Sequence, residues 1–155
     1  MKKLFLIALV ILCLSPILVY SAGSSVIQTP KIINDINSTL SLSWTSDDAT
    51  GAVSAAISAE NMAFVLGKWI TKVRCVPSQG AAKPTTLYDV TIKDSNGLDV
   101  MGGSLEDRTI VAGGDQALPY VGNAYGPTQV VDSLTLNVTN AGNSKTGIVI
   151  LDLSR

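Results

Sequence analysis

The sequence predicts an all-β protein, an antiparallel β-sandwich or jelly-roll-like domain of about eight to nine strands. Short runs in which apolar and polar residues alternate recur along the chain, and this period of two is typical of half-buried strands. Turn-forming residues separate these runs, and no long stretch shows the 3.6-residue period of an amphipathic helix. The 155 residues suffice for one such domain.

Residues 1–21 are typical of a secretory signal peptide. Lys2 and Lys3 precede an apolar run over 4–20, and small residues follow from Ser21. We place the cleavage after Ser21, with Gly23 as the alternative, and expect a periplasmic, secreted or cell-surface protein. If the segment stays uncleaved, it would be a membrane anchor and the only membrane contact, although its apolar run is at the short limit for a span.

Charge and residue usage exclude several classes of function. Loss of residues 1–21 removes two of the 11 basic residues and none of the 12 acidic ones, so the formal charge becomes 9 − 12 = −3. The remaining lysines and arginines are scattered, and we therefore expect no nucleic-acid partner. Only Lys68, Lys72 and Arg74 lie close together, on a strand face that we interpret as solvated. Cys75 alone remains, so no internal disulfide is expected.

Residues 22–38 precede the first clear strand. They are polar and irregular, with Pro30 among them, and they predict an N-terminal arm with at most a short strand near residues 31–33. The β-sandwich domain is expected to span 39–155. Its first strand covers 39–45, with alternate residues Leu40, Leu42 and Trp44 on one side. A turn over 46–51 follows, because Asp and Gly there favour turn conformations.

Residues 52–66 fit either a helix, which their alanines favour, or two short strands, which we prefer. After Gly67, residues 68–76 alternate strictly and predict a strand. One face of this strand would carry Trp69, Thr71, Val73 and Cys75. The opposite face would carry Lys68, Ile70, Lys72 and Arg74. In this arrangement Cys75 is a small buried hydrophobe and not a reactive thiol.

Loops and strands then alternate. Two prolines and a glycine predict a loop over 77–84, and a strand is expected over 87–93 with Tyr88, Val90 and Ile92 inward. Asn96-Gly97 indicates a type I′ hairpin turn. We therefore expect residues 98–101 to return antiparallel, a further short piece near 109–112, and a long surface loop over 113–128, rich in glycine.

The C-terminal pair of strands gives the clearest pattern. Residues 130–139 alternate, residues 140–143 form a turn, and residues 147–153 are almost continuously apolar. Such a run predicts a strand that is buried on both faces in the middle of a sheet.

Candidate sites for chemistry are few. The chain has no histidine, which removes the commonest general base and a common metal ligand, so we expect no enzyme, no cofactor and no metal. Paired carboxylates of a glycosidase would have to come from Asp89, Asp94, Asp99, Glu106, Asp107 and Asp115. Asp94, Asn96 and Asp99 could ligate Ca²⁺, but turn formation explains the same residues.

Tyr120 and Tyr125 lie on the predicted glycine-rich loop and are the candidate surface-binding residues. Aromatic rings on such a loop suit stacking against a sugar or contact with a protein. Packing of each ring onto the sheet edge is the alternative interpretation.

From Leu42 to Leu153 the chain resembles a family of small virion structural proteins of tailed bacteriophages, of the head-surface or decoration type. The succession of segments carries the resemblance: WTSDDATGAVS at 44–54, VP at 76–77, PT at 84–85, YDVTIKD at 88–94, GLDV at 97–100, LTLNV at 134–138 and AGN at 141–143. The resemblance implies a β-rich, non-catalytic protein that packs against copies of itself or other structural proteins, at a virion surface if the gene is viral. A secreted module that binds carbohydrate or a cell surface is the alternative.

Overall fold

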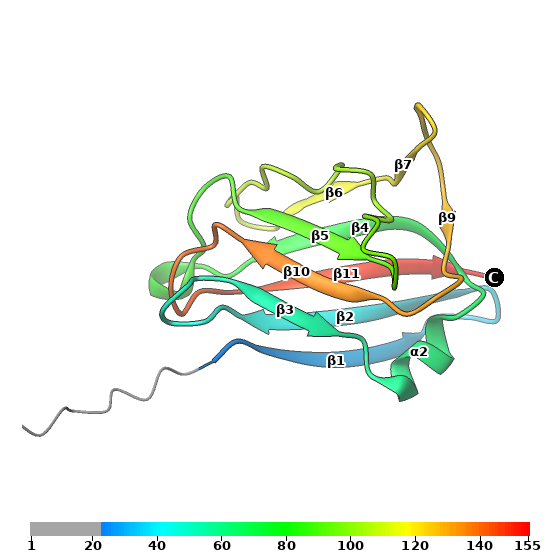
Figure 1. The fold of residues 1–155 in the computed structure, drawn as a ribbon, viewed down its shortest axis with the longest axis horizontal. Coiled ribbons are helices and arrows are strands. Elements are labelled where there is room, and N and C mark those ends of the chain that lie inside the picture. Colours follow the sequence, from blue (N-terminus) through cyan, green and yellow to red (C-terminus); the bar gives the residue numbers. More distant parts are fainter. Residues whose placement is uncertain (1–22) are drawn as a thin grey trace, which may run out of the picture.

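The computed structural model describes residues 23–155 and confirms the all-β, antiparallel, sandwich-like fold (Figure 1). The described residues form eleven strands, two more than the upper end of the expectation, because several short strands occur where a loop was predicted. The strands are β1 Ser25–Ile32, β2 Asn37–Thr45, β3 Val53–Ala56, β4 Trp69–Pro77, β5 Asp89–Lys93, β6 Asp115–Ala117, β7 Tyr120–Val121, β8 Ala124–Tyr125, β9 Thr128–Gln129, β10 Thr135–Thr139 and β11 Thr146–Ser154. The predicted signal peptide, residues 1–21, lies outside the described residues.

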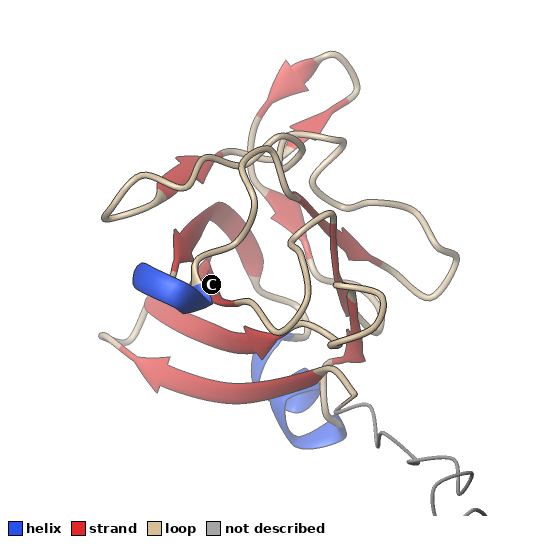
Figure 2. Cartoon of the chain, turned by 90° about the vertical axis from the view of Figure 1, so that its left-hand side faces the viewer, coloured by secondary structure: helices blue, strands red, loops and turns tan. Residues whose placement is uncertain are grey.

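The strands form two stacked layers. The larger sheet has the order β1-β2-β11-β4-β6, with β9 pairing with the start of β4, and the smaller has the order β3-β10-β5. Strands β7 and β8 form a separate hairpin that projects from the body in Figure 1. Two short helices, α2 (Ala59–Val65) and the 3₁₀ helix η1 (Gly80–Ala82), lie outside the strand layers in Figure 2.

The core lies between the two sheets and follows the predicted alternation. Leu40, Leu42 and Trp44 of β2 are buried, as expected. So are Tyr88, which directly precedes β5, and Val90 and Ile92 within it. The rings of Trp44 and Tyr88 connect the layers, with centroids 5.9 Å apart. Strand β11 has the predicted central position between β2 and β4, but its burial alternates, so one of its faces is only partly covered.

The predicted polar arm is wrong for residues 25–32, which form strand β1. This strand pairs antiparallel with β2 along its whole length, from Ser25 opposite Thr45 to Ile32 opposite Ser38. The Gln28 side chain also joins β1 to the other layer: its Nε2 donates to Ala56 O at 2.8 Å, and its Oε1 accepts from Ser58 N at 2.9 Å. Backbone pairing thus orders a segment whose side chains are mostly exposed.

The second of the two strands expected in 52–66 is a helix. Strand β3 occupies Val53–Ala56, but α2 follows over Ala59–Val65. Ser58 caps this helix, because its Oγ accepts from the backbone N–H of Asn61 at 3.3 Å. This capped helix of about two turns, with Val65 buried, forms in place of the expected strand.

Strand β4 has the predicted place but not the predicted faces. The register with β11 shifts between Asp152 and Leu153, so that Lys72 lies opposite Asp152 and Ile70 opposite Leu153. Thr71 is therefore the extra residue of a β-bulge, and the faces exchange there. Ile70 is buried with Val73 and Cys75, whereas Trp69 is exposed.

The remaining differences concern turns and short strands. Gly97 has φ +81° but Asn96 has no positive φ, so the predicted type I′ turn is wrong. Residues 98–101 form only an isolated bridge, Lys93 with Asp99, and 109–112 form no strand. The predicted loop 113–128 contains β6, β7, β8 and part of β9, and the strand expected over 130–139 is confined to β10.

Candidate protein-interaction surface at one end of the sandwich

One end of the sandwich gathers seven of the 14 large hydrophobic residues that are exposed in the described chain. The strand register places Ile32, Ser38, Leu153, Ile70 and Thr128 in one transverse row. This row and helix α2 mark what we call the α2 end, at the right of Figure 1. The same end carries the chain segments that leave β5 and enter β10, because Lys93 pairs with Thr135.

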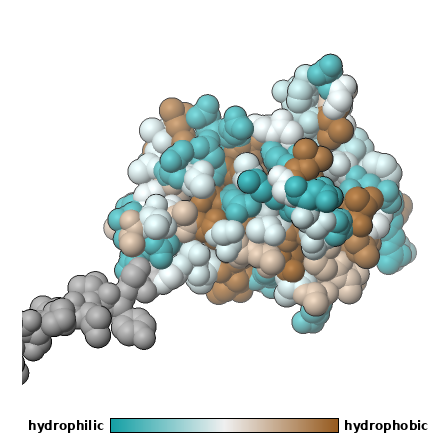
Figure 3. All heavy atoms as spheres, in the orientation of Figure 1, coloured by the Kyte–Doolittle hydropathy of each residue, from teal (hydrophilic) through white to brown (hydrophobic). Residues whose placement is uncertain are grey.

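The α2 end exposes more apolar surface than isolated surface residues would. Ile32 and Val131 are 72% and 74% exposed, so most of the surface of each residue faces solvent. Other large exposed hydrophobic residues at this end are Ile33, Ile36, Leu66, Trp69 and Leu98. Figure 3 shows brown apolar side chains at this end among polar ones. A gathering of this kind marks a binding surface more often than scattered single residues do.

The opposite end of the sandwich is closed by hydrogen-bonded turns. Ser46 Oγ donates to Gly142 O at 2.6 Å and accepts from Lys145 N at 2.8 Å. Thr85 N donates to Ala141 O at 2.8 Å. These bonds connect the turns of both layers. Polar groups of the turns are therefore hydrogen-bonded at this end, whereas the α2 end leaves apolar side chains exposed.

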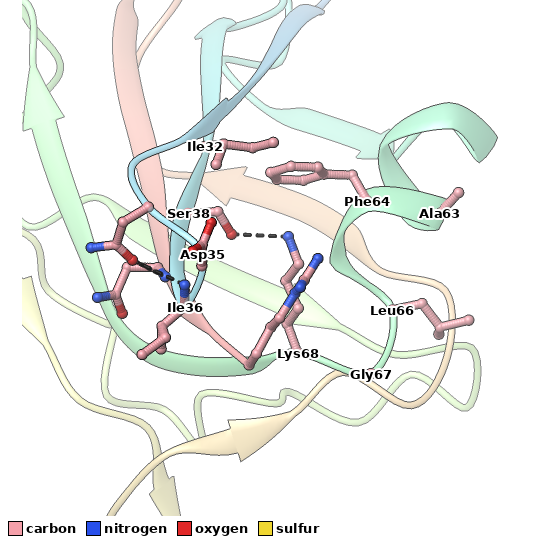
Figure 4. Close-up of a pocket in the computed structure, with 12 residues that line it drawn as sticks. Ile32, Asp35, Ile36, Ser38, Ala63, Phe64, Leu66, Gly67 and Lys68 are labelled. Carbon is pink, nitrogen blue, oxygen red and sulfur yellow. Dashed lines mark hydrogen bonds between the residues drawn. The ribbon is translucent and has the colours of Figure 1, made fainter.

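A pocket of about 520 Å³ opens at the α2 end (Figure 4). We call it the basic pocket; residues 32–38, the end of α2 with the following turn, Lys68 and Arg155 surround it. Ile32 lies over Phe64 on one side, and Ile36 lies across the pocket. The cavity therefore offers apolar walls with two cationic groups and one carboxylate, that of Asp35.

The two cations of the basic pocket form no ion pair with Asp35, whose carboxylate also lines it, or with any other described residue. Lys68 Nζ donates to Ser38 Oγ at 2.9 Å and lies 3.6 Å from the centroid of the Phe64 ring. Partial burial lowers the pKa of Lys68, and the Arg155 guanidinium lowers it further. All ion pairs found between described residues involve other groups, so an anion could bind here without displacing one.

A second cavity, the apolar groove, lies beside the basic pocket. It measures about 330 Å³, and its walls include Ile70, Leu98, Val131 and Tyr120. Three carboxylates, Asp94, Asp99 and Asp132, stand around it. The two cavities are adjacent, because Gly67 N donates to Val130 O and Val130 N to Lys68 O, each at 2.8 Å.

Tyr120 and Tyr125, the predicted surface-binding residues, come together on the β7–β8 hairpin. They are directly opposed across the two strands, with ring centroids 4.9 Å apart and planes inclined at 55°. Tyr125 is 69% exposed, whereas Tyr120 also lines the apolar groove. The pair thus forms an exposed aromatic corner and not a flat platform.

The carboxylates considered for calcium or glycoside chemistry have structural bonds. Asp99 accepts from the backbone N–H groups of Ile92, Met101 and Gly103. Asp94 accepts from those of Asn96 and Leu98, both at 2.9 Å, so it closes its own turn. Of the two interpretations of Asp94 and Asp99, calcium ligation and turn formation, these bonds favour turn formation.

The other four candidate carboxylates lie away from the cavities. Asp89 accepts from Asp107 N and from Asn140 Nδ2, and Asp115 forms an ion pair with Arg108 at 3.2 Å. Glu106 and Asp107 are exposed. Over residues 23–155, no group of three or more Cys, Asp or Glu side chains is placed to hold a metal ion.

The predicted basic strand face divides in two. Lys72 and Arg74 both contact Asp152, Arg74 with two bonds of 2.8 and 2.9 Å, whereas Lys68 points into the basic pocket.

Cys75 is fully buried, as predicted. In the described part of the chain, no helix has the length and apolar content that a bilayer span requires.

Sequence reasoning missed most of the α2 end. Ile32, Ile33 and Ile36 lie in the segment interpreted as a polar arm, and their apolar character there was the available signal. Arg155 joins Lys68 only through the fold, since 87 positions separate them.

Comparisons of the chain with protein-family models, curated proteins and solved structures give no match.

Proposed function

We propose that this domain is a non-catalytic structural protein that binds a neighbouring protein chain through its α2 end, in the manner of the phage virion proteins it resembles. The observation that carries the proposal is the exposed apolar surface around the basic pocket. Apolar area removed from water contributes about 25 cal/mol per Å². Burial of this surface against a partner would therefore stabilise an assembly, while exposure in a monomer contributes nothing to folding.

The α2 end has the composition of a protein interface. Trp69, which directly follows Lys68 of the basic pocket, is 40% exposed. Aromatic and arginine side chains dominate the binding energy of interfaces, and Trp69, Phe64 and Arg155 are all present at this end. Polar groups around them would form the rim that excludes water.

A non-catalytic role agrees with the bonding of the carboxylates. Asp89, Asp94, Asp99 and Asp115 are each engaged by backbone amides, an amide side chain or an arginine. A general acid–base pair needs two carboxyl groups that are free to face a substrate. In this chain the bonds of these groups serve turns and loops instead.

Site-specific photocrosslinking in the producing cell tests the proposal. A benzophenone amino acid at Leu66 would report on the α2 end, and the same amino acid at Leu87, which is equally exposed beside η1 and β5, is the matched control. We expect protein adducts from position 66 and few from position 87. Absence of protein adducts from position 66 would refute the assembly role.

The aromatic corner supports a second candidate, a module that binds carbohydrate or a cell surface. Tyr125 presents an exposed ring on a projecting hairpin, which is a suitable place for stacking on a sugar. Tyr125→Ala should then lower retention on immobilised glycans without a change in thermal stability. Equal retention of the two proteins on every glycan tested would dismiss this candidate.

We propose that the protein works outside the cytoplasm after residues 1–21 are removed. The basic start and apolar run of that segment support export. Intact mass of the protein from its producing cell tests this directly. A mass that begins at Ala22 or Ser24 fits the two expected cleavage sites, whereas a mass that includes Met1 favours an anchor.

A further inference from the structure

We infer that the chain bound at the α2 end is a second copy of this protein, related by a two-fold axis, with the Val131–Asp132 pair of each copy in the basic pocket of the other. This inference rests on the proposed function and names its partner. A two-fold interface uses the same surface on both copies, so it must be complementary to itself.

Charge provides the first element of self-complementarity. The basic pocket holds two cations, Lys68 and Arg155, and one carboxylate, Asp35, with no ion pair between them, and the neighbouring groove carries Asp132 at its edge. Hydrogen bonds from Ser95 Oγ and Ser133 N lower the pKa of Asp132, so it stays ionised at neutral pH. Facing opposite charges steer association and fix its register.

Apolar surface provides the second element. Val131 precedes Asp132 and is 74% exposed, more than any other large hydrophobic residue described. The basic pocket has Ile32, Ile36 and Leu66 among its walls. A carboxylate beside an apolar side chain therefore matches a pocket in which two cations outnumber the one carboxylate, Asp35, and lie beside apolar walls.

The position of the two patches suits a two-fold axis. The backbone bonds between Gly67 and Val130 and between Val130 and Lys68 hold the pocket and the Val131–Asp132 pair side by side. An axis that passes between adjacent patches exchanges them and makes both contacts at once. Trp69, paired with Gln129 at this junction, would then lie near the axis, where interface hot spots concentrate.

The same chain does not make this ion pair within itself. Lys68 is bound to Ser38 Oγ, its ammonium lies over Phe64, and it is not among the residues that line the groove. No ion pair joins Asp132 to Lys68 or Arg155 in the described chain. The charges are thus adjacent but directed apart, and a second copy can connect them.

Sedimentation velocity with charge reversal tests the inference. We expect the purified protein to form a dimer that weakens as salt rises, and Lys68→Glu or Asp132→Lys alone to weaken it about tenfold or more. An equimolar mixture of the two variants should dimerise again, because each interface then pairs opposite charges. Arg155→Glu is a second pocket variant that leaves the Lys68–Ser38 bond intact, and circular dichroism verifies that every variant is folded.

The outcomes separate this inference from the proposed function. A wild-type protein that stays monomeric at its highest soluble concentration overturns the inference, and so does a mixture of folded variants that fails to dimerise. If position 66 then crosslinks to a different protein in the cell, the assembly role stands with another partner. If position 66 crosslinks to no protein, both fail.

Discussion

Trp44 and Gly147 face each other across strands β2 and β11, and the indole occupies the space where a side chain at 147 would lie. A β-carbon on residue 147 would come within 2.6 Å of Trp44 Cζ2. Trp44 is buried and also contacts Tyr88 of the opposite layer. Glycine at 147 is therefore required by packing against the largest side chain of the core.

Gly147→Ala should destabilise the fold by about 1–3 kcal/mol, because the indole must move within a packed core. Gly126→Ala is the matched control, since no atom lies within 4 Å of a β-carbon there, and it should leave stability unchanged. Urea unfolding followed by tryptophan fluorescence measures both. Equal stability of the two variants would show that the Trp44 site tolerates expansion.

Gln28→Ala should destabilise the protein by about 1–2 kcal/mol, because three hydrogen bonds between the layers depend on this amide. Its Oε1 also accepts from Asn61 Nδ2 at 3.1 Å, so α2 loses an anchor. Thr29→Ala, next to it on the same strand and exposed, is the control. Chemical denaturation gives the free energies, and hydrogen exchange of β1 should accelerate only in the Gln28 variant. Unchanged exchange would indicate that strand pairing alone holds β1.

The period-two strands of the core could be predicted because their pattern is local. In β5, and in β2 from Leu40 onward, every second side chain is buried; at the start of β2, Ser38 and Thr39 are buried as well. Strand β4 alternates just as strictly in sequence, but Thr71 bulges, and its Oγ1 donates to Asp152 O at 3.0 Å. Such a bulge depends on the partner strand, which the local sequence does not contain.

The α2 end could not be predicted for a related reason. Ile32 has an apolar side chain in a strand, and sequence patterns place such side chains in the core. Its exposure follows from its position at the end of β1, the edge strand of the larger sheet; the side-chain contact of β1 with the smaller sheet is made by Gln28 instead. The tyrosine pair was found because its hairpin lies in a glycine-rich segment, where exposure is the local expectation.

Stability should fall at alkaline pH because of Cys75. Burial raises the pKa of this thiol from 9.0 to about 12, and the Asp115 carboxylate adds to the effect. Above pH 9 the thiol ionises in the unfolded chain but stays protonated in the folded one until about pH 12. The contribution to stability is therefore complete below pH 9 and is lost as pH rises from 9 toward 12.

Urea unfolding from pH 7 to pH 11 checks this dependence. Cys75→Ala lowers stability at every pH through its cavity, but its free energy of unfolding should decline less steeply above pH 9. Part of the decline should remain, since burial raises the pKa of Tyr88 as well. Parallel curves for the two proteins would mean that the thiol does not contribute.

Asp99→Asn should destabilise the fold by about 1–2 kcal/mol, although the substitution preserves shape. Asp99 Oδ1 accepts from Ile92 N and Met101 N at 3.2 and 3.1 Å, and Oδ2 accepts from Gly103 N at 2.7 Å. An amide replaces one acceptor oxygen by a donor, which leaves at least one backbone N–H without its partner. Asp107→Asn is the control, because that exposed side chain makes no such bonds.

The same variant tests the calcium hypothesis. A ligand that binds only the folded state raises the melting temperature, so a Ca²⁺ site at Asp94, Asn96 and Asp99 would stabilise the wild type in millimolar Ca²⁺. Since backbone amides occupy the Asp99 carboxylate, we expect the same melting temperature with calcium and with chelator. A calcium-dependent rise in the wild type that Asp99→Asn abolishes would contradict this, and would show that the carboxylate can exchange its amide partners for a cation.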